Sequence, residues 1–269
     1  MKQRSIITRR APFGGTQAVS RALAILDAFS DSHPEWGLAD LSRSLRLNKT
    51  TTLRLLGALE RTHLVVRGGP GSNYRLGPGA IELGARAQRA HSLPGVARGE
   101  LERLARVTKE AASIEVLVGS EILILDEVLG PHLVGRSQII GTRWPAHAAS
   151  TGKVLLAALR SGNAEPWQGP APAWPLKLEG YTARTITSPQ RFEAELTDVA
   201  RRGYATAIGE LEDDYVAIGA PIYNHQGRVV AAICVGGPST RLTEARIPSF
   251  ATALRQSADR ISRMLGSRV

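Results

Sequence analysis

The first third of the chain has a spacing of apolar residues that predicts three helices and then a strand hairpin. The helical patterns fall in residues 18–31, 37–49 and 47–65, and the first contains Val19, Leu23, Leu26 and Phe29. Two short strand-like runs follow, HLVVR at 63–67 and SNYRL at 72–76, and the GGPG between them favours a turn. Two helices joined by a tight turn and followed by such a hairpin are typical of a winged helix-turn-helix domain.

The rest of the chain mixes helical and strand patterns, which indicates an α+β domain. Amphipathic helices are expected at 76–91, 93–111, 150–162, 188–204 and 243–267. Strand-like runs occupy 112–119, 120–130 and a hairpin at 215–237. Ser188 and Pro189 are a suitable cap and first residue for the fourth of these helices. The Pro- and Trp-rich segment 163–180 is expected to form an ordered loop or lid.

The third predicted helix has a polar face that begins with three consecutive threonines. At about 100° per residue, Thr50, Arg54 and Arg61 lie opposite the leucines, and Thr51 borders the same face. Small polar residues at the start of a helix can approach base edges, as a DNA recognition helix requires. The pattern also fits a solvated helix face with Asn48 or Thr50 as its N-cap.

Positive charge is concentrated in the part of the chain that contains this helix. The whole chain has 34 Lys and Arg residues against 24 Asp and Glu residues, and residues 1–92 alone contain 14 basic and 6 acidic residues. Such a local excess suits phosphate contacts and counterion release on nucleic acid. No stretch approaches the roughly 18 apolar residues of a membrane span, so we expect no membrane partner.

Length, cysteine content and the N-terminal residues indicate the number of domains and the compartment of the protein. A chain of 269 residues predicts two domains, and 43% hydrophobic residues suffice for two cores. Residues 1–15 lack the apolar core of a secretory signal; they are compatible with a transit peptide, but we favour a basic disordered tail that adds to DNA affinity. The single cysteine, Cys234, permits no internal disulfide and suits the reducing cytoplasm, where we expect the protein.

Sequence patterns for an enzyme are incomplete. The six histidines show no HxH, HExxH or paired-cysteine spacing, so we expect no metal. His147, Ser150 and Asp126 imitate a hydrolytic triad, but the GxSxG elbow is missing and Ser150 suits a helix cap. TGKV at 151–154 is similar to the end of a P-loop, but His147 replaces the required upstream glycine and Val154 stands where a Ser or Thr would bind magnesium. We therefore expect a protein that is not an enzyme and needs no cofactor.

In their order and separation, these segments resemble the IclR-type bacterial transcriptional regulators over roughly residues 16–265. The resemblance rests on QAVSRALAILDAF, LNKTTTLRLLGALERTHLV and NYRLGPGAIELG in the first half. In the second half it rests on PAHAASTGKVLLA, IGAPIYNHQGRVVAAICVGGPSTRLT and the final helix. It implies a winged-helix domain joined by a helix to a GAF-like effector-binding domain, in homodimers or dimers of dimers that bind palindromic operators.

The expected architecture is therefore α+β, with an N-terminal winged helix-turn-helix domain and a C-terminal GAF-like α/β effector-binding domain. The expected boundaries are a basic disordered tail at 1–15, a DNA-binding domain at 16–77, a linker helix at 78–92 and an effector-binding domain at 93–269. The linker helix is also the candidate for joining two copies of the chain.

The expected DNA-binding residues lie on the third helix and the hairpin. Thr50, Thr51 and Arg54 are expected to enter the major groove of a double-stranded DNA operator. Contacts to phosphates or to the flanks of the groove are expected from Lys49, Arg61, Arg67 and Arg75. Thr52 and Tyr74 are also expected among the DNA-binding residues.

The resemblance also implies a pocket for a small organic acid. Its residues would be Ser150, Thr151 and Gly152 at a helix start, Ala207 and Ala217 on adjoining strands, and Cys234 and Gly236 on a late strand. Ala207 and Gly236 replace an acid and a hydroxyl residue of one branch of the family, which implies a less polar pocket. Because amides at a helix start bind carboxylates, the expected effector is a monocarboxylate with a hydrocarbon or aromatic body. Ala217 and Cys234 are equally compatible with plain core positions.

A GAF-type metabolite sensor that acts through protein partners is the alternative function. The basic polar face of the third helix favours the DNA-binding regulator over that alternative, because a sensor without DNA contacts has no need of it.

Overall fold

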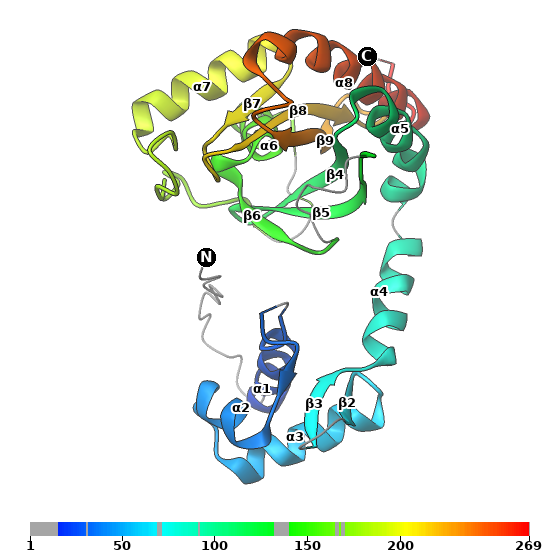
Figure 1. Cartoon of the computed structure of the whole chain (residues 1–269), viewed down its shortest axis with the longest axis vertical. Helices are drawn as coiled ribbons and strands as arrows, with labels where there is room; N and C mark the ends of the chain where they lie inside the picture. The colour runs from blue at the N-terminus through cyan, green and yellow to red at the C-terminus, as the bar shows by residue number, and fades with distance from the viewer. Residues whose placement is uncertain are drawn as a thin grey trace. The chain divides into compact units, whose positions relative to one another are not determined.

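The computed structural model describes residues 16–30, 32–68, 72–90, 92–131, 140–164, 167 and 170–268. The expectations for the tail at 1–15 and for most of the turn at 68–71 fall outside these residues. The chain forms two compact units, Met1–Ala90 and His91–Val269, whose elements are labelled in Figure 1. The fold class expected from the sequence is confirmed, because a helix-turn-helix unit comes first and an α/β unit follows.

The described residues of the first unit form the predicted helices and hairpin. The elements are α1 (Gln17–Asp27), β1 (Glu35–Trp36), α2 (Leu38–Ser44), α3 (Lys49–Arg61), β2 (Val65–Gly68), β3 (Asn73–Leu76) and α4 (Pro78–Ala90). Strand β3 pairs with β2 and with β1 in antiparallel register, with Val66 and Glu35 both opposite Arg75. The sequence did not predict β1, since two residues are too few to show an alternating pattern.

One cluster of buried side chains holds α1, α2 and α3 against the hairpin. It consists of Ile25, Phe29, Leu41, Leu56, Leu59, Val65 and Tyr74. The apolar spacing at 19–29 is only partly used, because Val19 and Leu23 are 60% and 55% exposed while Ile25 is buried. A helix with apolar residues on several sides buries the side that meets its neighbours, which the helix's own sequence does not specify.

The turn between α2 and α3 is tight and ends in a helix cap. Arg46 has a positive φ of 53°, in the left-handed region that tight turns use. The side chain of Asn48 accepts a hydrogen bond from the backbone N–H of Thr51 at 2.7 Å. The cap gives a partner to one of the amides that lack one in the first turn of a helix. Of the two caps considered from the sequence, the structure has Asn48.

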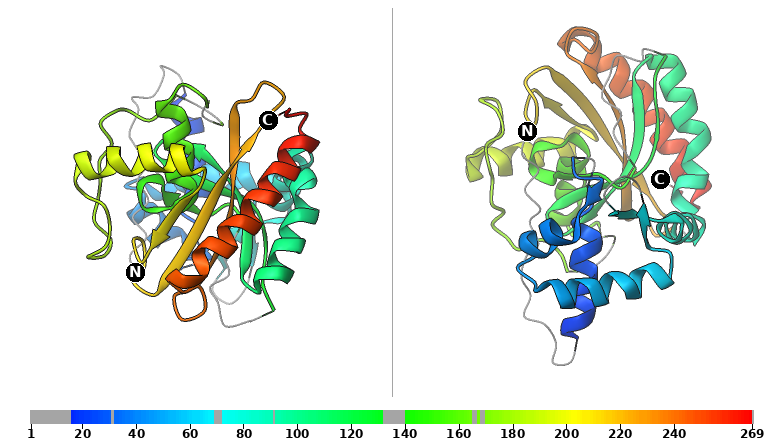
Figure 2. Two further views of the ribbon diagram at one scale, coloured as in Figure 1. Left: turned by 90° about the horizontal axis from the view of Figure 1, so that it is seen from above. Right: turned by 60° about the horizontal axis from the view of Figure 1, so that its bottom comes forward.

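The second unit is built on an antiparallel sheet whose described strands have the order β6-β5-β4-β9-β8-β7. The strands are β4 (Ala111–Val118), β5 (Glu121–Val128), β6 (Arg143–Pro145), β7 (Ala205–Ile208), β8 (Tyr215–Tyr223) and β9 (Val229–Pro238). The helices are α5 (Ser92–Thr108), α6 (Ser150–Arg160), α7 (Pro189–Arg202) and α8 (Ile247–Met264), with short 3-10 turns η1 (Ala146–Ala148) and η2 (Glu244–Arg246). Figure 2 shows α5 and α8 side by side along one face of the sheet.

The two faces of this sheet bury different sets of side chains, because successive residues along a strand point to opposite faces. On β9, Ile233 and Val235 pack with α5 and α8. Ala232, which precedes Ile233, packs with α6 and α7 on the opposite face. Cys234 also faces α6, where its sulfur lies 3.7 Å from the hydroxyl of Ser150. The residues that the sequence assigned to an effector pocket therefore belong to the α6 face.

The described residues of the segment 163–180 form no helix or named strand and are held by α6 and α7. The indole Nε1 of Trp174 donates a hydrogen bond to the carboxylate of Glu193 at 2.9 Å. The guanidinium of Arg160 lies 4.7 Å from the centre of the Trp174 ring. Trp174 thus fastens the segment to the outer surface of these helices.

Gly152 provides a test of how closely α6 packs against η1. A Cβ atom at Gly152 would collide with the carbonyl oxygen of Ala146, so Gly152→Ala should lower the free energy of unfolding by about 1–3 kcal/mol. In the control Gly99→Ala, on α5, the new methyl group meets no atom within 4 Å. That variant should gain up to about 1 kcal/mol from helix propensity. Urea denaturation measures both, and equal stabilities would show that the close approach is unimportant.

Candidate nucleic-acid interface and effector region

The three threonines at the start of α3 have three different environments. Thr50 is exposed, Thr51 is half-buried and Thr52 is fully buried. The hydroxyl of Thr52 donates to the backbone carbonyl of Asn48 at 3.1 Å. The prediction that Thr52 contacts DNA is therefore wrong: its side chain faces the protein core and supports the first turn of the helix.

The outer face of α3 is basic. Lys49, Arg54 and Arg61 are exposed, and none of them has a hydrogen bond or ion pair from its side chain to another described residue. Leu53 is also 48% exposed, although the sequence placed it on the side of the other leucines. This face combines charged, apolar and small side chains that are available to a partner.

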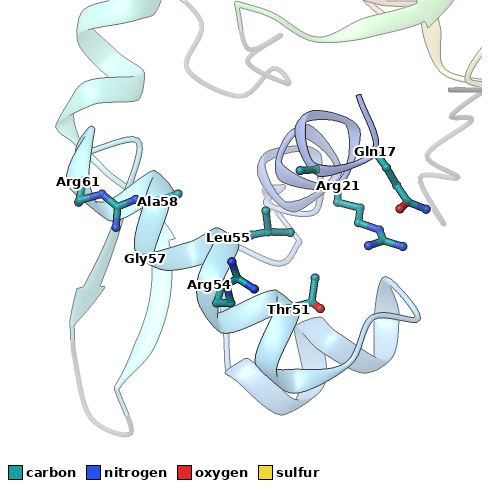
Figure 3. Close-up of a pocket in the computed structure, with 9 residues that line it drawn as sticks. Gln17, Arg21, Thr51, Arg54, Leu55, Gly57, Ala58 and Arg61 are labelled. Atoms are coloured by element: carbon teal, nitrogen blue, oxygen red, sulfur yellow. The ribbon is translucent and has the colours of Figure 1, made fainter. Parts of the chain in front are cut away.

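A groove runs between the outer face of α3 and the first turns of α1, with a volume of about 630 Å³. It is lined by Gln17, Ala18 and Arg21 from α1 and by Thr51, Arg54, Leu55, Gly57, Ala58 and Arg61 from α3. Figure 3 shows Arg21 extending from α1 and Arg54 rising from α3 into the space between the two helices. The sequence assigned no role to Gln17 or Arg21, because no local pattern indicates that α1 lies beside α3.

The hairpin presents two arginines on either side of a buried tyrosine. Arg67 and Arg75 are exposed on β2 and β3. Tyr74 is only 1% exposed and belongs to the core of the first unit, so the prediction that it contacts DNA is wrong. Its ring lies 5.5 Å below the guanidinium of Arg67, whose Nε donates to the carbonyl of Ser72 at 3.4 Å. Tyr74 thus positions Arg67.

The start of α6 in the second unit is enclosed by protein on several sides. Ala149 is the N-cap, and Ser150 does not cap the helix, contrary to the expectation from its sequence. Ser150 and Thr151 are both 1% exposed, and Gly219 on β8 lies against the backbone that joins them. The sulfur of Cys234 lies next to Ser150. The structure thus brings Ser150, Thr151 and Cys234 together, as a common pocket requires.

A buried glutamate, Glu115 on β4, lies at the centre of this region and was missed from the sequence. It accepts hydrogen bonds from the hydroxyl of Thr151 and, at 2.7 Å, from the hydroxyl of Ser113. Burial raises the pKa of Glu115, and the two hydrogen bonds oppose that effect only in part. The signal was present in the strand ASIEVLVG, where a glutamate interrupts an otherwise apolar run.

The small residues assigned to the pocket form a row across three strands. Ala207 on β7 is opposite Ala217 on β8, which is opposite Gly236 on β9. The row does not leave open space at Gly236, however. A Cβ atom there would collide with the hydroxyl and ring of Tyr215, so the small size of Gly236 accommodates Tyr215. In this structure the side chain of Tyr215 takes up the space beside Gly236 that was expected for a ligand.

A buried ion pair joins α6 to the loop after β7. Lys153 is 1% exposed, and its Nζ lies 2.5 Å from a carboxylate oxygen of Glu210 and 2.9 Å from the carbonyl oxygen of Thr206. Glu195 on α7 lies 3.7 Å from the same Nζ. The pair fixes the first turn of α6 against β7 and α7.

The residues that imitate a hydrolytic triad have other partners. His147 Nε2 lies 2.9 Å from the carbonyl oxygen of Glu179, and burial lowers the pKa of His147. Asp126 accepts a hydrogen bond from Arg98 at 2.9 Å, and the hydroxyl of Ser150 meets Cys234. Within the part of the chain that the structure describes, His, Cys, Asp and Glu form no group of three that could hold a metal ion. None of the described helices is both long and apolar enough to cross a membrane.

Comparison with known proteins agrees with this architecture along most of the chain. The IclR helix-turn-helix domain matches residues 18–69, and the C-terminal domain of the bacterial transcriptional regulator IclR matches residues 86–263. The HTH-type transcriptional regulator XynR of Escherichia coli K12 is 31% identical, over 93% of this chain and 97% of its own.

Two solved structures extend the likeness to three dimensions. A transcriptional regulator, RHA06195 of Rhodococcus sp. RHA1, has a TM-score of 0.79 with 29% identity over 93% of this chain and 98% of its own. An IclR homologue from Microbacterium hydrocarbonoxydans, solved in complex with 4-hydroxybenzoate, has a TM-score of 0.77 with 27% identity. It covers 92% of this chain and 98% of its own.

A helix-turn-helix domain followed by this C-terminal domain defines a bacterial transcriptional regulator, and the named relatives are regulators rather than enzymes. The chain belongs to the IclR family. The resemblance seen in its sequence is confirmed.

The Lys153–Glu210 pair allows a test of how α6 is held against β7 and α7. Glu210→Ala leaves Lys153 charged and buried beside the more distant Glu195, and should lower the free energy of unfolding by about 3–5 kcal/mol. The control Asp198→Ala breaks an exposed ion pair with Arg201 and should cost no more than about 1 kcal/mol. Thermal and urea unfolding measure the two losses of stability. If Glu210→Ala loses no more than Asp198→Ala, the Lys153–Glu210 ion pair does not hold α6 in place.

Proposed function

We propose that this regulator binds a palindromic DNA operator through α3 and the β2–β3 hairpin, and that a small organic acid in the second unit controls binding. The observation that supports DNA binding best is the outer face of α3, where Arg54 and Arg61 have no carboxylate partner among the described residues. Such guanidinium groups attract phosphates and can form paired hydrogen bonds to guanine.

The proposed contacts divide into base reading and phosphate binding. Thr50, Thr51 and Arg54 lie in the first two turns of α3, which a recognition helix places against base edges. Lys49 and Arg61 on the same helix, with Arg67 and Arg75 on the hairpin, bind the backbone on both sides of the major groove. These four charges supply affinity that is independent of the base sequence.

A single copy of the first unit offers few base contacts, so we propose a homodimer or a dimer of dimers on a two-fold operator. Helix α4 is the proposed linker between the two units of each chain and the proposed contact between copies. Its side chains Ile81 and Leu83 are 76% and 58% exposed, which suits burial against a second copy.

For the effector we propose a monocarboxylate with an apolar or aromatic body. Support comes from the convergence of Ser150, Thr151 and Cys234 at the start of α6, and from the relative that was solved with 4-hydroxybenzoate. The ligand's carboxylate would compete with Glu115 for the Thr151 hydroxyl. Such a ligand controls transcription only if the DNA-competent and DNA-incompetent forms bind it with different affinities.

Two variants of α3 test base reading and phosphate binding separately. Operator duplexes are first selected from random DNA with the wild-type protein. Arg54→Ala should weaken operator binding by about 1–3 kcal/mol and relax base preference at one position, because it removes a paired contact to a base. Lys49→Ala should weaken operator and scrambled duplexes equally and reduce the salt dependence of affinity by about one phosphate contact. Fluorescence anisotropy at several salt concentrations measures both.

Failure of these expectations has a clear form. If folded Arg54→Ala protein binds the operator as tightly as the wild type does, Arg54 does not read a base. If the wild-type protein selects no duplex, operator binding itself is wrong, and action through protein partners becomes the better explanation.

A thermal-shift screen of aliphatic and aromatic monocarboxylates, with their amides, tests the effector. An acid present at about 100 times its dissociation constant should stabilise the protein by about 2.7 kcal/mol, and its neutral amide should bind more weakly. Ser150→Ala should weaken binding of the acid. Glu115→Gln should strengthen binding of the acid, because it removes the repulsion between two carboxylates, and should leave amide binding unchanged. Equal binding of acids and amides would exclude a carboxylate site here.

A further inference from the structure

The groove between α1 and α3 contains more positive charge than the base-reading face alone requires. Arg54 and Arg61 form one wall, and Arg21 of α1, which is half-buried, approaches from the other. Figure 3 shows Arg21 and Arg54 on opposite sides of the same space, with Thr51 and Leu55 between the helices. A phosphate in this groove would have guanidinium groups on both sides.

These arginines are not neutralised by the described part of the protein. In the first unit, the ion pairs among described residues join Arg43 to Asp40 on α2 and Arg86 to Glu82 on α4. Arg21 has neither a carboxylate partner nor a side-chain hydrogen bond there. Like charges around one groove repel each other, so the arrangement favours an anion supplied from outside.

The groove is not uniformly polar, and this narrows the identity of the anion. Ala18 of α1 and Leu55 and Ala58 of α3 form an apolar part of its lining. A DNA strand alternates charged phosphates with deoxyribose rings that present C–H groups. Guanidinium groups beside small apolar side chains match that alternation, whereas a free inorganic anion would make no use of the apolar lining.

We propose that this groove holds the sugar–phosphate backbone of the DNA strand that borders the major groove entered by α3, with Arg21 on a phosphate and Ala18 and Leu55 against deoxyribose. The proposal rests on the operator binding proposed above and adds α1 to the interface. Arg21 positions the protein on the duplex, and it contacts no base, because phosphate contacts set register and orientation without reading sequence.

The experiment compares Arg21→Ala, Arg21→Lys and Arg201→Ala in the full-length protein. Affinity is measured by fluorescence anisotropy for the selected operator and for a scrambled duplex, at salt concentrations from about 50 to about 300 mM. Over such a range the slope of log affinity against log salt reports the number of phosphate contacts. Arg21→Ala should weaken both duplexes by the same factor and make the salt slope shallower by about one. Arg21→Lys, which retains the charge, should keep most of the slope. Arg201→Ala removes the same charge from an exposed ion pair with Asp198 on α7, outside the proposed interfaces, and should leave the slope unchanged.

A second arm locates the phosphate. Operators are made with one phosphate at a time replaced by neutral methylphosphonate and are tested with wild-type protein. Affinity should fall at a position outside the bases that Arg54 reads. With the Arg21→Ala protein, neutralising that phosphate should cause no further loss of affinity, because the Arg21–phosphate contact is already absent.

The outcomes separate this proposal from operator binding in general. If Arg54→Ala behaves as predicted and Arg21→Ala matches Arg201→Ala, the groove holds no backbone while operator binding stands. If Arg21→Ala affects only the selected operator, Arg21 reads a base and the proposal is wrong. If circular dichroism shows that Arg21→Ala does not fold, the methylphosphonate scan is repeated with Arg21→Lys and compared with the wild-type scan. If the effect of Arg21→Lys adds fully to the loss from the methylphosphonate at every position, Arg21 contacts none of these phosphates and the proposal is wrong.

Discussion

The rotation of α3 about its own axis is the constraint on which its basic outer face depends. Leu56 and Leu59 are buried against Ile25 and Tyr74, so the opposite side of the helix, with Arg54, faces outward. Because each residue turns the helix by about 100°, burying Gly57 and Glu60 in place of Leu56 and Leu59 would bring a charged side chain into the core. The burial of two leucines therefore determines which side chains a partner meets.

The same rotation explains three consecutive threonines in a helix that they do not favour. Thr52 points inward and bonds the carbonyl of Asn48, Thr50 points outward, and Thr51 borders the groove beside α1. A longer side chain in the outward position would hold the helix away from a partner, and a hydroxyl in the inward position finds a backbone acceptor. Packing and function thus select the same residue type for different reasons.

The second unit is governed by the need to pair polar groups that its sheet and α6 bury. Glu115 is satisfied by two hydroxyls, and Lys153 by Glu210 and a backbone carbonyl. Such networks are stable when complete and costly when one member is lost. In the proposed function, a ligand at the start of α6 gains its effect by exchanging one of these contacts, Thr151 with Glu115, for its own. The network therefore offers a means by which a small acid could alter the position of α6.

Local patterns sufficed for the helix-turn-helix and hairpin, for the order of the longer helices and strands, and for limiting the cap of α3 to Asn48 or Thr50, since the spacing and chemistry of neighbouring residues specify each of these. Local patterns did not reveal that Val19 is exposed, that Glu115 accepts the hydrogen bond of the Thr151 hydroxyl, or that Gly236 makes room for Tyr215. Each of these depends on a partner distant in the chain. Gly236 and Tyr215 become neighbours only after β8 and β9 pair, and a helix with several apolar sides buries whichever one the assembled core presents to it.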